Sequence, residues 1–306
     1  MRIVFAGTPI NAAKTLNALV GAGNTIVGVL TRADAPTGRS GTVTESPVAA
    51  VASSLGIPVL KSNTVDTDVL DWISGLKPDL GVIVAYGCIL KSDALEIPSK
   101  GWINVHYSLL PKYAGASPVQ HAILDGETET GVTVFKLDEG VDTGPVLSVQ
   151  RTEIRPDENT GELLERLTEI GSELLCRTLG DLDNQYSSRS FQEIDSTRVA
   201  TRKISRALAR LDFNQSSKDV VNKVRAMNPE PVAWFEFESL PVRVLEATVE
   251  GSAELAAGVA RLLGSQLIVG CSDGSVALEV VQPAGKKPMS GADWFRGLRR
   301  DSLLLS

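Results

Sequence analysis

The chain has 306 residues, 43% of them apolar and 22% charged, with a net charge of −7, which is ordinary for a globular protein of two domains with sizeable cores. No apolar run approaches the about 18 residues that span a bilayer, and the N-terminus lacks a signal peptide, so we expect a cytoplasmic protein without membrane contact. The 3 cysteines are far apart and form no Cys-x-x-Cys pair, which excludes a disulfide framework or a thiolate zinc site.

The first part of the chain alternates apolar runs with helix-compatible segments. Residues 2–6 predict a strand, 11–20 a helix and 25–30 a second strand. With more strand and helix candidates behind it, this opening predicts a parallel sheet with helices on both faces. Gly7 is the one glycine of the first turn, so the dinucleotide fingerprint is absent and we predict neither NAD nor FAD.

Residues 31–47 are rich in Gly, Pro, Ser and Thr and contain Arg39. They predict a long exposed loop, which in a compact protein is usually functional or disordered. Residues 80–85 are a continuous apolar run, as expected for a central parallel strand covered on both faces. That run ends at the turn Tyr86-Gly87.

The stretch from Trp102 to Val146 holds the candidate chemistry. Residues 102–106 predict a buried strand that stops at Leu-Leu-Pro, which places His106 at the carboxyl end of a strand, where ligands bind in open α/β sheets. Asn104 lies two residues earlier on the same face. Asp142 follows a further predicted strand, in a Gly-bounded loop that could return to the same edge. The alternative is a structural histidine and a plain Asp-Thr-Gly turn.

The second part of the chain has a different pattern. A capping pair, Asn159 and Glu162, predicts the start of an amphipathic helix, and the pattern fails near residues 183–188. We therefore expect a first domain over 1–187, a basic linker over 188–206 and a second domain over 207–306. In that domain, a capped helix at 216–227 and several short strands predict a small closed barrel of the oligonucleotide-binding kind.

Charge is unevenly distributed along the chain. Residues 1–200 contain 16 basic and 25 acidic side chains, whereas residues 201–306 contain 14 basic and 12 acidic ones. The segment 196–211 has no acid, and a polyanion would be steered to it unless it is simply a solvated linker face. Its cations are Arg198, Arg202, Lys203, Arg206 and Arg210.

A long ordered set of motifs resembles the folate-dependent formyltransferases. It comprises Asn104-Val105-His106, Ser108-Leu109-Leu110-Pro111, Gly115, Pro118, Ala122-Ile123, Gly126, Thr130-Gly131-Val132-Thr133 and Asp142-Thr143-Gly144. The resemblance implies a Rossmann-like N-terminal domain in which Asn104, His106 and Asp142 act on the formyl group of 10-formyltetrahydrofolate. It also implies that Ser108, Leu109, Leu110 and Pro111 help hold the folate. Tyr86 and Gly87 resemble the pteridine pocket of the family, although a strand-ending turn explains their side chains equally well.

Two further regions resemble the methionyl-tRNA branch of this family, namely residues 34–48 and the C-terminal segments 225–234 and 282–287. With the basic segment, this resemblance implies an initiator methionyl-tRNA substrate held by six cations, Arg39, Arg202, Lys203, Arg206, Lys286 and Lys287. The chain departs from the family at Ala114, where Arg is usual, at Tyr107, where a small residue is usual, and at Ser40–Val43, where basic residues are usual. We expect Ala114 to remove a cation beside the active-site loop and Tyr107 to add bulk there.

Residue chemistry fits formyl transfer to an amine. Asn104 can donate to the oxyanion, His106 can move protons near neutral pH, and Asp142 can orient the imidazole and accept the amine proton. We expect no metal, because the formyl donor is already activated and no paired-ligand motif supports a site built from His106, His121 and Asp142. Our first expectation is a monomeric enzyme that transfers the formyl group to initiator methionyl-tRNA. The alternatives are a formyltransferase acting on the amine of a sugar nucleotide, and an inactive protein that binds folate or nucleic acid.

Overall fold

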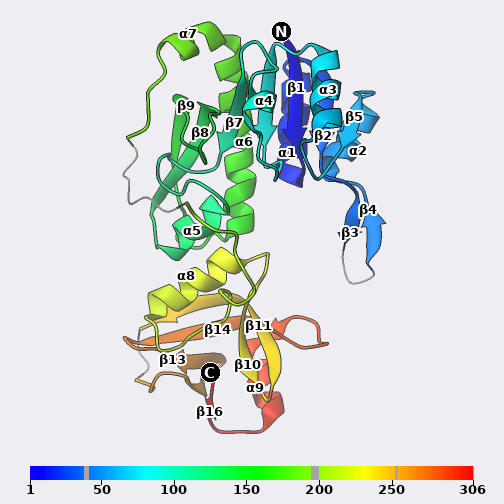
Figure 1. Ribbon diagram of the computed structural model, residues 1–306. Helices are drawn as coiled ribbons and strands as arrows, with labels where there is room; N and C mark the ends of the chain where they lie inside the picture. Colours follow the sequence, from blue (N-terminus) through cyan, green and yellow to red (C-terminus); the bar gives the residue numbers. More distant parts are fainter. Residues whose placement is uncertain (38–40, 194–199, 252–253, 306) are drawn as a thin grey trace. The chain divides into compact units, whose positions relative to one another are not determined.

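The computed structural model describes residues 1–37, 41–193, 200–251 and 254–305 (Figure 1). The chain divides into two compact units that interleave along the sequence. Unit 1 comprises Met1–Gly115, Thr130–Thr152 and Leu164–Ala200, and unit 2 comprises Ala116–Glu129, Glu153–Leu163 and Thr201–Ser306. The contiguous limits 1–187, 188–206 and 207–306 stay a prediction.

Unit 1 is built on a sheet with the strand order β5-β2-β1-β6-β7-β8-β9. The pairs from β5 to β7 are parallel, and β8 is antiparallel to β7. β6 is buried along its whole length, as its unbroken apolar sequence predicts. The strand bounds are β1 Arg2–Gly7, β2 Thr25–Thr31, β5 Val59–Lys61, β6 Leu80–Val84, β7 Trp102–His106, β8 Glu129–Lys136 and β9 Val146–Glu153.

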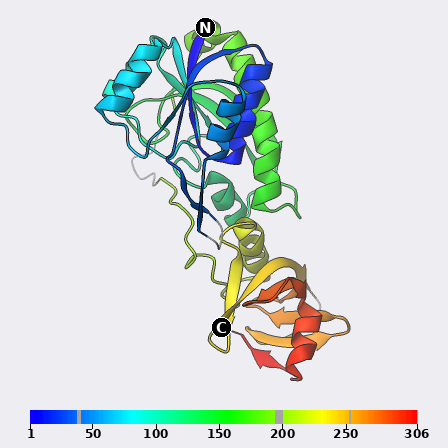
Figure 2. The same cartoon turned by 90° about the vertical axis from the view of Figure 1, so that its right-hand side faces the viewer.

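Helices cover both faces of this sheet, as predicted. In Figure 2, α3 (cyan) lies on one side of the strands, and α1 and the part of α6 in unit 1 (blue and green) lie on the other. Gly171 of α6 lets that helix approach the sheet closely, since a Cβ there would lie 3.1 Å from Val105 and Val132. The helix bounds are α1 Ile10–Gly21, α2 Pro47–Ser54, α3 Thr67–Leu76, α4 Ser92–Leu95, α6 Thr160–Gly180 and α7 Leu182–Ser187.

The predicted loop over 31–47 contains more structure than its composition suggested. β3 (Ala35–Thr37) and β4 (Thr42–Thr44) pair as an antiparallel hairpin. Thr and Val favour extended backbone, and the hairpin gives that segment a bonding partner that a composition argument does not see. Arg39 lies outside the described residues.

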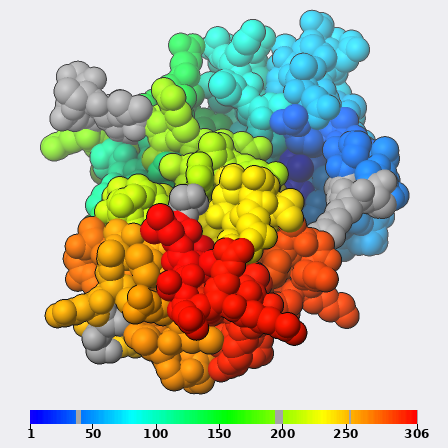
Figure 3. Space-filling view, turned by 90° about the horizontal axis from the view of Figure 1, so that it is seen from below, coloured from blue at the N-terminus to red at the C-terminus, as the bar shows by residue number. Residues whose placement is uncertain are grey.

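Unit 2 curls an antiparallel sheet, ordered β10-β11-β14-β13-β12-β16, around its own apolar core. Figure 3 shows the C-terminal residues (red) against residues coloured orange, and β12 pairs with β16 in an antiparallel arrangement. The sheet is OB-like, as predicted, but it forms a half-barrel and not the expected closed barrel, since β10 and β16 do not pair among the described residues. The bounds are α5 Pro118–Leu124, α8 Ser217–Met227, β10 Ala233–Phe237, β11 Leu240–Glu250, β12 Val259–Leu263, β13 Gln266–Gly270, β14 Ser275–Pro283, β15 Met289–Ser290, α9 Gly291–Leu298 and β16 Leu303–Leu304.

Helix starts follow the predicted capping residues. Asn159 Oδ1 accepts the backbone N–H groups of Gly161 and Glu162 at 2.8 and 3.2 Å, and Glu162 Oε2 accepts the N–H of Asn159 at 2.9 Å, which is a capping box. Ser216 caps α8 through the N–H of Asp219 at 3.1 Å. Among the described residues, none of the helices is both long enough and apolar enough to cross a membrane.

Candidate active site

His106 is the last residue of β7 and is 6% exposed. Its neighbour across the sheet is Thr133 of β8, and the ring meets the edge of Phe135 at a centroid distance of 6.5 Å. Nε2–H donates to the carbonyl of Tyr113 at 2.9 Å. Strand, aromatic ring and carbonyl therefore hold the imidazole in one orientation and leave Nδ1 for another partner.

That partner is Asp142, in the connection between β8 and β9. Its Oδ2 lies 3.6 Å from His106 Nδ1, which is longer than an ordinary N–H···O hydrogen bond and defines an ion pair when the ring is protonated. The same oxygen accepts the N–H of Gly115 at 2.7 Å. The backbone of Asp142 is left-handed, with φ of +53°, a conformation that costs free energy for a residue with a side chain. Contacts with the surrounding residues must therefore stabilise this conformation.

Asn104 lies two positions before His106, so both side chains face the same side of β7. It pairs with Ile83 of β6 and Phe135 of β8, and its side chain is half-buried. Its Oδ1 is buried and has no hydrogen-bond partner in the described part of the protein. An unpaired buried acceptor costs about 1–3 kcal/mol, so this amide is poorly explained by stability alone. The structure thus brings the Asp142 carboxylate to the His106 imidazole and places the Asn104 amide on the same strand face as that imidazole, while the catalytic roles of the three stay a prediction.

The Ser108–Pro111 turn is fixed to the sheet by Thr133. Thr133 Oγ1 donates to the carbonyl of Ser108 at 2.7 Å and accepts the N–H of Leu110 at 3.2 Å. The buried hydroxyl of Ser108 donates to the carbonyl of Lys112 at 2.6 Å, so it holds the turn itself. Sequence reasoning gave Thr133 no role. The folate contacts of Ser108, Leu109, Leu110 and Pro111 stay a prediction.

Tyr86 and Gly87 follow β6. The Tyr86 side chain is 2% exposed and packs in the core, where burial raises the pKa of its phenol and its hydroxyl donates to the carbonyl of Ser62 at 3.3 Å. Gly87 is exposed with φ of +87°, and its carbonyl accepts a bond from Arg32 at 3.1 Å. Any contact that this turn makes with a flat heterocycle must therefore come from backbone groups, as the resemblance implies.

The two departures near the site have different consequences. Tyr107 points away from His106 into the core, where its hydroxyl accepts a bond from Asn11 Nδ2 at 3.2 Å and burial raises its pKa. Sequence reasoning had placed its bulk beside the site, and this was wrong because the alternation of β7 continues to Tyr107, which lies with Val105 on the side of the sheet that faces Gly171 of α6. Ala114 is buried, next to the Gly115 N–H that binds Asp142.

Two residues that hold Asp142 were not singled out as site residues from the sequence. Gly115 belongs to the family motif, which is a usable signal. Gln192 follows the end of α7 and donates from Nε2 to the carbonyls of Asp142 and Gly144, at 3.0 and 2.7 Å. It lies in a polar segment that resembled a domain end, and nothing in its sequence pattern indicates these contacts.

Most of the predicted tRNA-binding cations lie on unit 2. Arg206 is exposed and lies 5.6 Å from the ring centroid of Trp234, and Arg210 lies 5.7 Å from the same ring. Sequence reasoning did not single out Arg210 or Trp234 as site residues, although both lie in segments that it had marked. The other exposed members of the predicted set are Arg202, Lys203, Lys286 and Lys287. A role in tRNA binding stays a prediction for all of them, Arg39 included.

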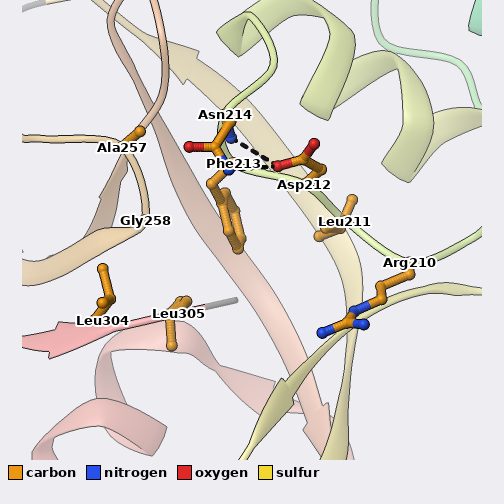
Figure 4. A pocket seen from close by; sticks show the side chains of 9 residues that line it. All are labelled: Arg210, Leu211, Asp212, Phe213, Asn214, Ala257, Gly258, Leu304 and Leu305. Atoms are coloured by element: carbon orange, nitrogen blue, oxygen red, sulfur yellow. Dashed lines mark hydrogen bonds between the residues drawn. The ribbon is translucent and has the colours of Figure 1, made fainter.

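Unit 2 also contains a surface hollow of about 480 Å³, seen from close by in Figure 4. Leu211, Phe213 and Leu305 give it an apolar wall. The Asp212 carboxylate is bonded to the backbone N–H and side-chain amide of Asn214, at 3.0 and 2.9 Å, and these bonds lower its pKa. The Asp212 carboxylate is therefore held by Asn214, whereas Asp142 in unit 1 faces an imidazole.

The part of the chain that the structure describes contains no group of three or more His, Cys, Asp or Glu side chains placed to hold a metal ion. The metal-free mechanism remains a prediction that rests on the chemistry of the substrates.

Comparison with family models matches nearly the whole chain. Residues 1–179 match the model described as formyl transferase, and residues 203–299 match the model of the formyl transferase C-terminal domain. A methionyl-tRNA formyltransferase from Renibacterium salmoninarum is 42% identical over 299 residues, which cover 97% of each chain. One from Paenarthrobacter aurescens is also 42% identical, with the same coverage.

Among solved structures, the chain resembles an N-formyltransferase from Helicobacter canadensis in complex with folinic acid and dTDP-3-aminofucose. The TM-score is 0.66, the identity is 18%, and the match covers 92% of this chain and 98% of that one. At this identity the likeness concerns the fold.

Proposed function

Because the chain belongs to the formyl transferase family, we propose that it transfers the formyl group of 10-formyltetrahydrofolate to the amino group of methionine on charged initiator tRNA. The relatives that are 42% identical over almost the full length bear the name of this activity, which supports this acceptor over other amines. The resemblance of both the N-terminal and C-terminal segments to one branch of the family supports the same choice.

The observation that carries the reaction type is the 3.6 Å approach of Asp142 to His106, on the same strand face as Asn104. In the transfer, the amine nitrogen attacks the formyl carbon, a new C–N bond forms, and the bond from that carbon to the folate nitrogen breaks. The amine loses a proton and the folate nitrogen gains one. Negative charge collects meanwhile on the formyl oxygen.

Each of the three side chains has one task in this scheme. The Asn104 amide donates to the formyl oxygen, an effect on the order of 10²–10³ in rate for one donor. His106 donates a proton to the leaving nitrogen. Asp142 orients the ring and accepts the amine proton, directly or through water. Its bond from Gly115 aims the carboxylate before substrate arrives.

We propose that tRNA is bound by six cations, Arg39, Arg202, Lys203, Arg206, Lys286 and Lys287. The five members within the described residues are exposed, as groups that neutralise phosphates must be. Their stretch of sequence, 201–306, also has a positive balance of charge, in contrast to 1–200. Phosphate contacts of this kind fix the position of a nucleic acid and carry no sequence information.

The same proposal includes the 10-formyl form of the folate, bound by Ser108, Leu109, Leu110, Pro111 and the backbone of Tyr86 and Gly87. It also includes a cytoplasmic, monomeric enzyme organised as domain 1–187, linker 188–206 and domain 207–306. Size-exclusion chromatography with light scattering tests the monomer, and limited proteolysis at 188–206 tests the limits.

A competition between acceptors tests the function. Purified protein is given formyl-labelled 10-formyltetrahydrofolate with charged initiator tRNA and an aminosugar nucleotide together, and the labelled amine is identified. Label on the methionyl amine is expected. Label on the sugar would establish the alternative enzyme, and no label on either acceptor would indicate a binding protein. The Asp142→Asn variant serves as the catalytically impaired control.

A further inference from the structure

Gln192 reaches the Asp142 loop from a segment fifty positions later in the chain. Its Nε2 donates one hydrogen to the carbonyl of Asp142 and the other to that of Gly144. The segment is itself tied to β9, because Ser190 and Val146 exchange backbone hydrogen bonds of 3.0 and 2.8 Å. Gln192 therefore binds the loop on both sides of Thr143, and its own segment is held in place by the bonds between Ser190 and Val146.

The orientation of this amide is forced. Two carbonyl oxygens face one nitrogen, and rotating the amide by a half-turn would direct its own oxygen at both of them. Gln192 Oε1 is buried and finds no hydrogen-bond partner within the described residues. A glutamine kept for stability alone would pair both ends, since an unpaired buried acceptor is destabilising. The two donated bonds are what this side chain contributes.

The bonds act where the loop most needs support. Asp142 is held at a φ of +53°, which few residues with side chains adopt unaided. On the other side, the loop is closed by Asp138, whose Oδ1 accepts from Thr143 Oγ1 at 2.6 Å and from the N–H of Gly140 at 3.0 Å. Asp138 is the acceptor in both bonds and has no hydrogen to donate to the Asp142 carbonyl, whereas Gln192 donates to it.

We propose that Gln192 is a positioning residue that holds the Asp142 backbone in its left-handed conformation, so that the carboxylate faces His106. The effect of Gln192 on catalysis rests on the proposed formyl transfer. Its effect on the geometry of Asp142 does not depend on that function. Glutamate cannot replace it, because a carboxylate has no hydrogen to donate and would repel both carbonyls. Methionine keeps the length and removes both bonds.

Kinetics of a double-mutant cycle test how Gln192 acts. We expect Gln192→Met to lower kcat on the order of 10–100-fold, the usual cost of a misplaced catalytic group, with KM nearly unchanged. In the Asp142→Asn background the same change is expected to cost less than about twofold, because the two residues act as one unit. Gln150→Met, at an exposed glutamine of β9, is the matched control and should leave kcat unchanged. Equal losses in both backgrounds would overturn the proposal.

A spectroscopic measurement decides the geometry without activity. The chain has 2 histidines, so the imidazole ¹H–¹⁵N NMR spectrum contains His106 and an internal reference, His121, whose ring bonds the carbonyl of Arg202 in unit 2. Both Gln192→Met and Gln192→Glu are expected to move the His106 signals and leave those of His121 in place. Unchanged His106 signals in two folded variants would refute the positioning role. If wild-type protein transferred no formyl group, the proposed function would fail and this test would still stand.

Discussion

The candidate active site of unit 1 and the predicted tRNA-binding cations of unit 2 are polar in opposite ways. His106 is buried and Asp142 half-buried, and hydrogen bonds with Tyr113, Gly115 and the distant Gln192 hold them. The predicted tRNA-binding cations that the structure describes in unit 2 are exposed instead. We expect the first region to depend on position to within about 0.5 Å and the second to depend on total charge.

This contrast separates two kinds of mutational effect. A change at the candidate active site should reduce kcat, because the roles proposed for its groups are on the reacting atoms. A change among the cations should raise the KM for tRNA and make that KM less dependent on salt concentration, because each proposed phosphate contact releases its own counterions. The substitutions below test whether the two regions are separable in this way.

The largest effect is expected at the ion pair. His106→Ala and Asp142→Asn should each lower kcat on the order of 10²–10⁴-fold, the usual contribution of a general acid or base. Single-turnover formylation of charged initiator tRNA measures the loss, and the melting temperature verifies folding. A variant that retained near-normal turnover would remove that residue from the mechanism.

Asn104→Leu should divide activity from stability. Leucine is close in size and removes the unpaired Oδ1, so we expect a fall on the order of 10²–10³-fold in kcat together with an unfolding free energy that is unchanged or up to about 1 kcal/mol higher. Urea denaturation and single-turnover kinetics measure both quantities. A clear loss of stability would mean that the amide is structural.

Tyr107→Phe tests the opposite face of β7. It leaves the buried Asn11 amide without its 3.2 Å partner, so the unfolding free energy should drop by about 1–3 kcal/mol. Because the hydroxyl points away from His106, kcat should stay within about twofold of wild type. A large kinetic effect with normal stability would contradict the assignment of this side chain to the core.

The smallest effect is expected from Lys286→Gln combined with Lys287→Gln. KM for tRNA should rise several-fold at moderate salt, and the slope of log K against log salt should decrease by roughly 0.9 per lost contact, while kcat is unchanged. Arg296→Gln is the matched control, because that cation is paired with Asp293 at 2.8 Å. A similar change of slope in the control would show that net charge alone matters, and a reduced kcat in the lysine variant would break the separation of the two regions.

Much of the molecule could be predicted from local patterns. The apolar run of β6, the capping box of α6, and the alternation of β7 that puts Asn104 and His106 on one face all follow from neighbouring residues and backbone geometry. The hairpin of β3 and β4 could not be predicted from composition, because a segment rich in Gly, Pro, Ser and Thr is typical of a loop and does not indicate which of its residues pair. The side of the strand occupied by Tyr107 was misjudged even though the period-2 rule was sufficient to predict it.

The sequence by itself determined the residue types of the site, their order, and the family to which they belong, because side-chain chemistry and motif spacing are written along the chain. Only the tertiary structure decided that Asp142 adopts φ of +53° 3.6 Å from His106, and that Gln192 and Gly115 hold it there. Those contacts join segments far apart in the chain, and their geometry depends on how the sheet and its loops pack together, which no local pattern specifies.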